Sequence, residues 1–293
     1  MKKLLFLINP HAGKTSISSN LIKIIDIFIK GGYEVEVLVT QSSDHMREVA
    51  ESRGGEFDTV VCCGGDGTLS ICAEYLLKSD KVPELGYIPA GTTNDFARAR
   101  GIPLDPVKAA KAIVGGKRHE IDVGYFGDTP YLYVAAFGAF SDVSYATSRS
   151  LKRAIGHAAY VLGGIKELVK IKDYHIKFNI NGEVIEDDFI YGMLSNTTRV
   201  GGFKLNLFKE FNLDDGLIDI TLVRKPKGFI GRSRLMNALV SQRSDGIELL
   251  QFRADSVSYE SDSKIRWTLD GEYGGAFYEK EVTIRRKTLT MLY

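Results

Sequence analysis

Two short polar turns carry residues that could hold a phosphate group. The first, Gly64-Gly65-Asp66-Gly67-Thr68, follows the apolar run DTVVCC, and the second, PAGTTNDFA over 89–97, follows the apolar run ELGYIP. A glycine-rich turn between a strand and a helix lets backbone N–H groups approach a phosphate, and the helix N-terminus favours its negative charge. Asp66 adds a carboxylate suited to Mg²⁺. A tight turn that needs glycine only for its dihedral angles explains the first segment equally well.

The second turn favours a shared ligand site. The carboxyl ends of neighbouring parallel strands meet at one sheet edge, so both turns can serve one ligand. Thr92 and Thr93 can donate hydroxyl hydrogen bonds to a phosphate, and Asn94 or Asp95 can cap a helix or help to hold a metal. Capping would explain Asn94 or Asp95 individually, but it does not explain the whole polar cluster. We therefore predict a phosphate and metal site at this edge.

Two further segments carry chemistry only in combination with these turns. Asn9-Pro10-His11-Ala12-Gly13-Lys14 ends the first apolar run and presents the Lys14 cation, but it lacks the P-loop spacing. A lysine in a loop is usually solvated surface. Leu269-Asp270-Gly271-Glu272, considered alone, reads as a hairpin turn with two exposed acids.

The segments that must position these turns alternate between strand-like and helical patterns up to about residue 122. Amphipathic helical stretches are expected near 19–31 and 44–53, from 67, and near 93–100 and 105–115, separated by the apolar runs KLLFLIN, EVEVLVT, DTVVCC and ELGYIP. Asp105-Pro106 supplies the cap and first turn of the last helix. This rhythm predicts a parallel sheet covered by helices, with ligand loops at the carboxyl ends of its strands.

Strand-like segments dominate after about residue 122, with Asn181-Gly182 and Asp270-Gly271 as turn signals and one helical interruption near 148–171. We therefore predict an α/β protein of two domains. Residues 1–122 are expected to form a Rossmann-like α/β domain, and residues 123–293 a second, mostly antiparallel β domain.

Composition narrows the range of partners. The 293 residues include 38 basic and 37 acidic ones, a formal charge of +1 that gives no global field for nucleic acid. No run reaches the roughly 18 apolar residues of a spanning helix. The stretch 224–234, RKPKGFIGRSR, mixes five cations with Phe229-Ile230 and suits an anionic lipid surface. Solvated surface charge is the commoner explanation for it, and for a second basic group, Arg149, Lys152 and Arg153.

The segments NPHAGK, GGDGT, PAGTTNDFAR and LDGE, in this order and spacing, resemble the diacylglycerol kinase catalytic-domain family. The resemblance covers essentially the whole chain. It implies that residues 1–122 are the nucleotide-binding domain and that residues 123–293 are a β-sandwich domain for the lipid substrate, whose last strand can return to the first domain. GGDGT is shared with NAD kinases and phosphofructokinase-like enzymes, whereas LDGE together with the early NP-x-AGK selects lipid kinases. The resemblance implies ATP and Mg²⁺ as cofactors and transfer of the γ-phosphate to diacylglycerol, giving phosphatidic acid. Phosphatidylglycerol and sphingoid bases remain alternative acceptors.

The resemblance also assigns roles to individual residues. Asp66 and Asp95 match acids that organise the catalytic magnesium. Glu272 matches the general base that takes the proton of the lipid hydroxyl. The nucleotide is expected to contact Asn9, Lys14, Thr40, Gly64, Gly65, Asp66, Gly67, Thr68, Thr92 and Asn94.

A second metal site is implied in the later half of the chain. Its loop resembles 212–217, with the Asp215 carboxylate and the backbone oxygens of Asn212 and Leu217 as ligands. An Asp-Gly turn before a strand explains the same residues. Asp122, near the predicted domain junction, matches an acid that supports the active-site network.

Three rival functions are less consistent with these segments. An NAD kinase shares the GGDGT turn but has no use for NP-x-AGK and LDGE. A non-catalytic nucleotide-binding or lipid-binding protein would be signalled by loss of Asp66 or Glu272, and both are present. A Rossmann dehydrogenase needs G-x-G-x-x-G after the first strand, where NPHAGK stands.

We expect a cytoplasmic enzyme that acts peripherally at the inner face of the membrane. Its partners would be a lipid substrate and anionic phospholipids, without nucleic acid, and a homodimer is an open possibility.

Overall fold

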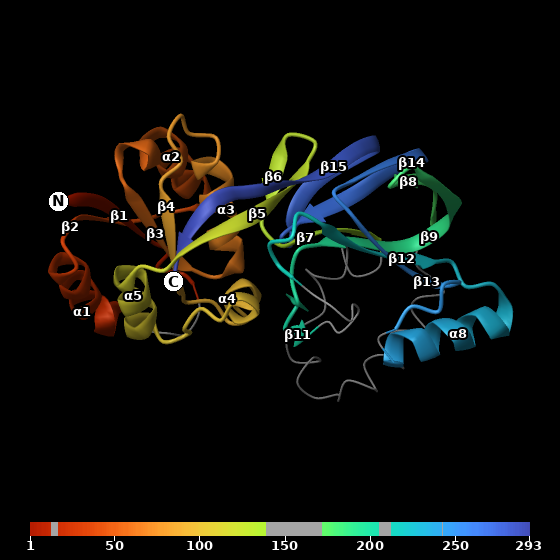
Figure 1. Ribbon diagram of the computed structural model, residues 1–293, viewed down its shortest axis with the longest axis horizontal. Helices are drawn as coiled ribbons and strands as arrows, with labels where there is room; N and C mark the ends of the chain where they lie inside the picture. Colours follow the sequence, from red (N-terminus) through yellow and green to blue (C-terminus); the bar gives the residue numbers. More distant parts are fainter. Residues whose placement is uncertain (13–16, 139–171, 205–211, 242) are drawn as a thin grey trace.

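The structure, a computed structural model, describes residues 1–12, 17–138, 172–204, 212–241 and 243–293. Figure 1 shows an elongated molecule with a helix-covered N-terminal half and a β-rich half, which long strands connect. Lys14, the helix expected near 148–171 and the basic group at 149–153 lie outside the described residues.

The N-terminal half is built on parallel strands in the order β2-β1-β3-β4. Alternate side chains of β1 enter opposite cores: Leu4 and Phe6 pack on one face of the sheet, Leu5 and Leu7 on the other. This alternation arises because successive residues of a strand point to opposite faces. The bounds of these strands are β1 Lys2–Ile8, β2 Tyr33–Val39, β3 Thr59–Gly64 and β4 Glu84–Pro89.

Helices cover both faces of this parallel sheet. α1 (Ile17–Lys30) and α5 (Pro106–Gly115) contact each other on one face, and α2 (Ser43–Arg53) and α3 (Asp66–Leu76) on the other. A 3₁₀ turn, Gly54–Glu56, and the short helix α4, Asp95–Arg100, complete this half. α5 begins as predicted, with Pro106 in its first turn and the Asp105 carboxylate accepting the N–H of Lys108 at 2.8 Å.

The second half consists mainly of antiparallel strands around an aromatic core. The Trp267 ring lies 4.9 Å from those of Phe126 and Phe137 and 5.3 Å from that of Tyr259. The strands are β5 Arg118–Phe126, β6 Thr129–Tyr131, β7 Val134–Gly138, β8 Tyr174–Ile180, β9 Glu183–Ser195, β12 Ile218–Arg224, β13 Leu249–Ala254 and β14 Ser256–Leu269. A separate two-stranded hairpin is formed by β10 Arg199–Val200 and β11 Phe203–Lys204.

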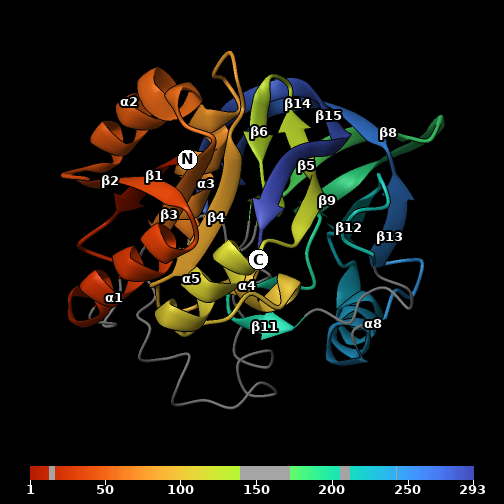
Figure 2. The same ribbon diagram turned by 60° about the vertical axis from the view of Figure 1, so that its left-hand side comes forward.

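The last strand, β15 (Glu272–Leu292), joins the two halves. It pairs antiparallel with β14 and β5, and its end pairs parallel with β4 through Met291 and Leu292. Figures 1 and 2 show β5 and β15 crossing together from one half to the other. Within the described residues, thirteen strands therefore form one continuous sheet.

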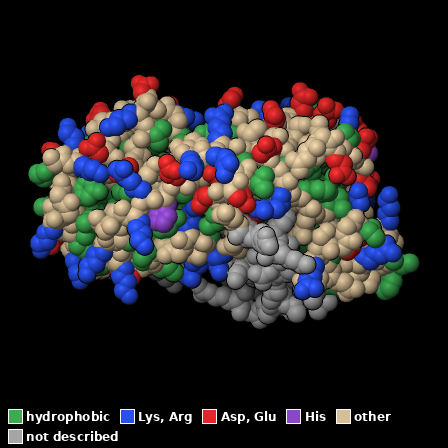
Figure 3. Space-filling view, viewed as in Figure 1, with side chains coloured by type: hydrophobic (Ala, Val, Ile, Leu, Met, Phe, Trp, Pro, Cys, Tyr) green, Lys and Arg blue, Asp and Glu red, His purple; other side chains and the backbone are tan. Residues whose placement is uncertain are grey.

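The α/β architecture with an antiparallel β-rich second half confirms the predicted fold class. One detail differs from the prediction. Part of the basic stretch 224–234, for which no helix was expected, begins helix α8, Gly228–Ser241. Figure 3 shows acidic and basic side chains interspersed over one face, as expected for a nearly neutral chain.

Candidate active site

The two polar turns lie side by side at the carboxyl ends of β3 and β4. Gly64 pairs with Pro89 in the sheet, and its carbonyl accepts the N–H of Ala90 at 2.7 Å. A β-carbon on Gly91 would lie only 2.6 Å from the α-carbon of Gly65. Side chains at this contact would separate the turns, so close backbone approach explains why glycine stands there.

Asp66 ties the two turns together. Its Oδ2 accepts the N–H of Asp95 at 2.9 Å, and its Oδ1 accepts the N–H of Phe96 at 3.1 Å. The carboxylate thereby satisfies free donors at the start of α4, where the helix dipole favours negative charge. Burial raises the pKa of Asp66 above its usual range, and these two hydrogen bonds offset part of the rise.

Asn94 fixes the shape of the second turn. Its φ of +51° is left-handed, a conformation that asparagine tolerates better than most residues. The side-chain Oδ1 accepts the N–H of Gly91, and Nδ2 donates to the Gly91 carbonyl, both at 3.0 Å. Asn94 occupies the position before α4, but its side chain makes no capping bond to that helix.

Asp95 faces the second half of the molecule. Its Oδ2 accepts the N–H of Gly202 at 2.8 Å, and Arg199 Nε lies 3.8 Å from Oδ1. Burial raises the pKa of Asp95, and the nearby Arg199 opposes that rise. Arg199 and Gly202 belong to the β10–β11 hairpin, which no sequence motif marked as part of the site.

Among the described residues, the buried Asp95 Oδ1 atom has no hydrogen-bond partner, and its ion-pair contact with Arg199 Nε is long, at 3.8 Å. A buried polar atom without a partner needs an explanation such as a missing water or ion. Carboxylate oxygen is the ligand type that Mg²⁺ prefers, and Mg²⁺ commonly takes one or two carboxylates plus substrate phosphates. Asp95, with Asp66 beside it, therefore fits a magnesium ion that nucleotide oxygens would complete.

Other expected nucleotide contacts that the structure describes lie at the same sheet edge. Asn9 Nδ2 donates to Thr68 Oγ1 at 2.9 Å, which links the end of β1 to the GGDGT turn. Thr40 follows β2 and is held by two bonds to the Ile8 carbonyl, from its N–H at 2.9 Å and its hydroxyl at 3.2 Å. Thr92 is exposed on the second turn.

Glu272 reaches this edge from the other half of the molecule. It is the first residue of β15 and follows a turn in which Asp270 and Gly271 have φ of +51° and +89°. Its Oε1 lies 3.2 Å from the point that a β-carbon on Gly67 would occupy. The proposed base therefore faces the GGDGT turn across the junction of the two halves.

Asp270, two residues earlier, is almost fully buried, so the expectation of two exposed acids in this turn is wrong for it. Its carboxylate accepts four hydrogen bonds of 2.7 to 3.0 Å, from the hydroxyl of Ser70 and the N–H groups of Leu132, Tyr133 and Val134. Burial raises its pKa, and the four donors offset part of that rise. Asp270 thus attaches the Glu272 hairpin to α3 and to the β6–β7 connection.

Asp122 is a second buried acid that connects separate segments. Its two carboxylate oxygens accept the N–H of Gly216 at 2.7 Å and the N–H of Lys287 at 2.9 Å. Its own N–H donates to Asp214 Oδ1 at 3.1 Å. Asp214 also forms a two-pronged pair with Arg100 of α4, with both distances 3.0 Å. This network joins the loop at 212–217 to α4 in the N-terminal half.

At the predicted second metal site, an arginine side chain pairs with the carboxylate that was expected to bind the metal. Asp215 pairs with Arg253, which also pairs with Asp219, and the other Asp215 oxygen accepts the N–H of Leu217 at 3.1 Å. The Asn212 side chain accepts the N–H of Asp214 at 3.3 Å. Within the described residues, no group of three or more His, Cys, Asp or Glu side chains could hold a metal by itself. The second site therefore stays a prediction.

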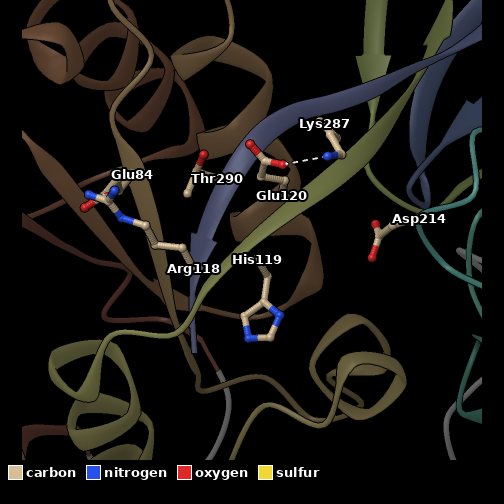
Figure 4. A pocket seen from close by; sticks show the side chains of 7 residues that line it. All are labelled: Glu84, Arg118, His119, Glu120, Asp214, Lys287 and Thr290. Carbon is tan, nitrogen blue, oxygen red and sulfur yellow. Dashed lines mark ion pairs between the residues drawn. The ribbon is translucent and has the colours of Figure 1, made fainter.

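A separate open cavity of about 480 Å³ lies beside β5 and β15. Figure 4 shows its polar lining, in which Lys287 and Glu120 form an ion pair of 3.1 Å. Arg118 pairs with Glu84 in the same cavity. Asp214 and Lys287 of the network described above line it, but none of the residues of the two polar turns does. Because the ion pairs of this cavity already match its charges, the sheet edge is the better candidate for a nucleotide site.

Comparison with known proteins matches both halves of the chain to one group of enzymes. Residues 3–126 match the diacylglycerol kinase catalytic domain, and residues 134–292 match the YegS C-terminal NAD kinase beta sandwich-like domain. A diacylglycerol kinase of Bacillus subtilis (strain 168) is 30% identical over 290 residues, which cover 98% of this chain and 95% of the relative. The chain belongs to the diacylglycerol kinase catalytic-domain family.

A further relative and a solved structure support the same family. A diacylglycerol kinase of Staphylococcus carnosus (strain TM300) is 29% identical over 94% of this chain and 90% of its own. A crystal structure from Bacillus anthracis str. Sterne has a TM-score of 0.84 at 25% identity, over 100% of this chain and 97% of that one. Family membership makes the protein a lipid kinase and implies that it uses ATP. In the described part of the kinase, no helix is long and apolar enough to cross a membrane.

Proposed function

We propose that this kinase transfers the γ-phosphate of ATP to the hydroxyl of diacylglycerol, giving phosphatidic acid and ADP, at the cytoplasmic face of a membrane. The observation that carries the proposal is the approach of the Glu272 carboxylate to Gly67 in the GGDGT turn. A base and a phosphate-binding turn that face each other from two halves of a molecule suit phosphoryl transfer, which depends mainly on positioning and charge stabilisation. The names of the relatives support diacylglycerol as the acceptor.

In this proposal, the first half holds ATP and the metal, and the second half supplies the base. The turns around Gly65 and Gly91 would hold the phosphates of ATP, with N–H donors at the start of α3. Asp95 and Asp66 would hold Mg²⁺, which when bound neutralises charge on the phosphate oxygens. Glu272 would accept the proton of the lipid hydroxyl as that oxygen attacks the γ-phosphorus. The bond between the γ-phosphorus and its bridging oxygen breaks, and ADP leaves.

The acceptor can be tested directly by offering several hydroxyl compounds in parallel. The kinase is incubated with ATP labelled in its γ-phosphate and with Mg²⁺. Each reaction contains one acceptor in mixed micelles: diacylglycerol, phosphatidylglycerol, a sphingoid base or NAD. We expect label in phosphatidic acid at a rate well above that for the other three. Preferential labelling of phosphatidylglycerol or the sphingoid base would show that this lipid, and not diacylglycerol, is the acceptor. Labelling of NAD would overturn the proposal of a lipid acceptor.

A further inference from the structure

An apolar pair stands exposed at the start of α8. Phe229 is 85% and Ile230 67% exposed, at the first turn of a helix whose opposite side is packed. That packed side carries Gly231, Leu235 and Ala238 at helical spacing, all of them buried. Phe229 stands two positions before Gly231 and so projects from the opposite side of the helix. The exposed pair therefore has no place in the core that holds α8.

The attachment of α8 explains why the pair cannot turn inward. Leu235 and Ala238 join a small core with Ile190, Val223 and Leu249 of the sheet. A β-carbon on Gly231 would lie 2.8 Å from an oxygen of Glu248, so the helix backbone approaches its support closely. These contacts fix the rotation of the helix and keep Phe229 and Ile230 directed away from the protein.

The surroundings of the pair are strongly basic. Residues 224–244 include six basic residues and no acidic one. Arg224 and Lys225 are matched by Asp187 and Asp173, at 3.0 and 2.8 Å. Three exposed cations near the pair have no ion-pair partner among the residues that the structure describes: Lys227, Arg232 and Arg234.

We propose that the first turn of α8 is a membrane-docking tip, formed by Phe229 and Ile230 with the cations Lys227, Arg232 and Arg234. The two apolar side chains would enter the interfacial region of an anionic bilayer, and the three cations would contact its phosphate headgroups. This role rests on the proposed function, since a kinase of diacylglycerol must meet an acceptor whose acyl chains remain in the bilayer. In Figure 3, apolar and basic side chains occur together at the lower right end, where Figure 1 places the start of α8.

The observations favour a lipid surface over a protein partner. A stable protein interface buries at least about 1,200 Å² in total, which two apolar side chains at one helix end do not provide. Pairing of two copies through the tip would bring two groups of unpaired cations together at a repulsive distance. A bilayer needs only shallow insertion and supplies many negative charges, so two apolar residues and three cations suit it.

The test measures binding to vesicles without turnover. Wild-type protein and the double variant Phe229→Ser with Ile230→Ser are sedimented with vesicles of phosphatidylcholine alone and of phosphatidylcholine mixed with phosphatidylglycerol. We expect the wild type to bind the mixed vesicles and the variant to bind them about tenfold or more weakly. The matched control is Ile22→Ser with Ile29→Ser, which removes two exposed apolar residues from α1 in the other half. We expect that control to bind as the wild type does.

Two further measurements separate the explanations. Size-exclusion chromatography of the tip variant should give the wild-type elution volume, and a smaller particle would instead assign the tip to a contact between copies. Phosphorylation of a short-chain, monomeric diacylglycerol should be unchanged, while phosphorylation of vesicle-bound diacylglycerol should fall. Equal vesicle binding by wild type and tip variant would overturn the docking tip. Tip-dependent binding without any lipid phosphorylation would leave the tip standing and overturn the proposed function.

Discussion

At the residue scale, the two acids of the hairpin at 269–272 lie in opposite environments. Glu272 is exposed beside the GGDGT turn, whereas Asp270 is buried under four hydrogen-bond donors. Those donors are 136 to 200 residues away in the chain, so no local pattern could reveal them. The predicted role of Glu272 came from resemblance to a family, whereas the hydrogen bonds of Asp270 could be recognised only in the folded chain.

Replacing Asp270 with Asn should affect both stability and turnover. An amide keeps one acceptor oxygen and turns an NH₂ group toward N–H or O–H donors, so buried donors lose their partners. We expect the free energy of unfolding to fall by about 2 to 3 kcal/mol in urea titrations. Because the hairpin that carries Glu272 would shift, kcat should fall by about 100-fold, with little change in the KM for ATP.

Ser70→Ala provides the control for this variant, because it removes only one of the four donors. Its unfolding free energy should fall by about 1 kcal/mol, with nearly normal kcat. Wild-type kcat in the Asp270 variant, measured well below its melting temperature, would limit Asp270 to a stabilising role.

At the element scale, the sheet edge proposed to bind the nucleotide follows from ordinary β/α packing. The apolar runs, helix caps and glycine turns of the first half predicted its strands and helices well, because β1, β3 and β4 are buried on both faces. α8 escaped prediction because its apolar residues do not form one stripe: Phe229 and Ile230 point outward, and basic residues separate them from Leu235. The β10–β11 hairpin was missed because two-residue strands leave little pattern.

Gly91→Ala tests whether the two phosphate turns must touch. The new methyl group would lie 2.6 Å from the α-carbon of Gly65, so the turns must separate. We expect the free energy of unfolding to fall by about 1 to 3 kcal/mol and ATP binding to weaken in calorimetric titrations. Gly115→Ala is the matched control, since nothing lies within 4 Å of its new methyl group at the end of α5. Equal behaviour of the two variants would mean that the contact between the turns is not needed.

At the scale of the whole molecule, the active site is assembled from both halves. β5 and β15 cross between them, Asp95 of the first half binds Gly202 of the second, and Arg100 binds Asp214. Glu272 stands at the beginning of the same strand whose far end pairs with β4, so one continuous element spans from the proposed base to the parallel sheet. Sequence spacing indicated two folding units, but the contacts between them could be recognised only in three dimensions.

The role of Glu272 is tested most directly by comparing wild type with Glu272→Gln in two assays, ATP binding by calorimetry and single-turnover transfer of labelled γ-phosphate to diacylglycerol. Because Glu272 is exposed and Gln has nearly the same shape, unfolding free energy and ATP affinity should stay unchanged. Loss of the base should slow transfer by about 100- to 10,000-fold. Transfer at a near-normal rate would contradict the assignment of Glu272 as the base and, with it, the mechanism in which the two halves present base and nucleotide to each other.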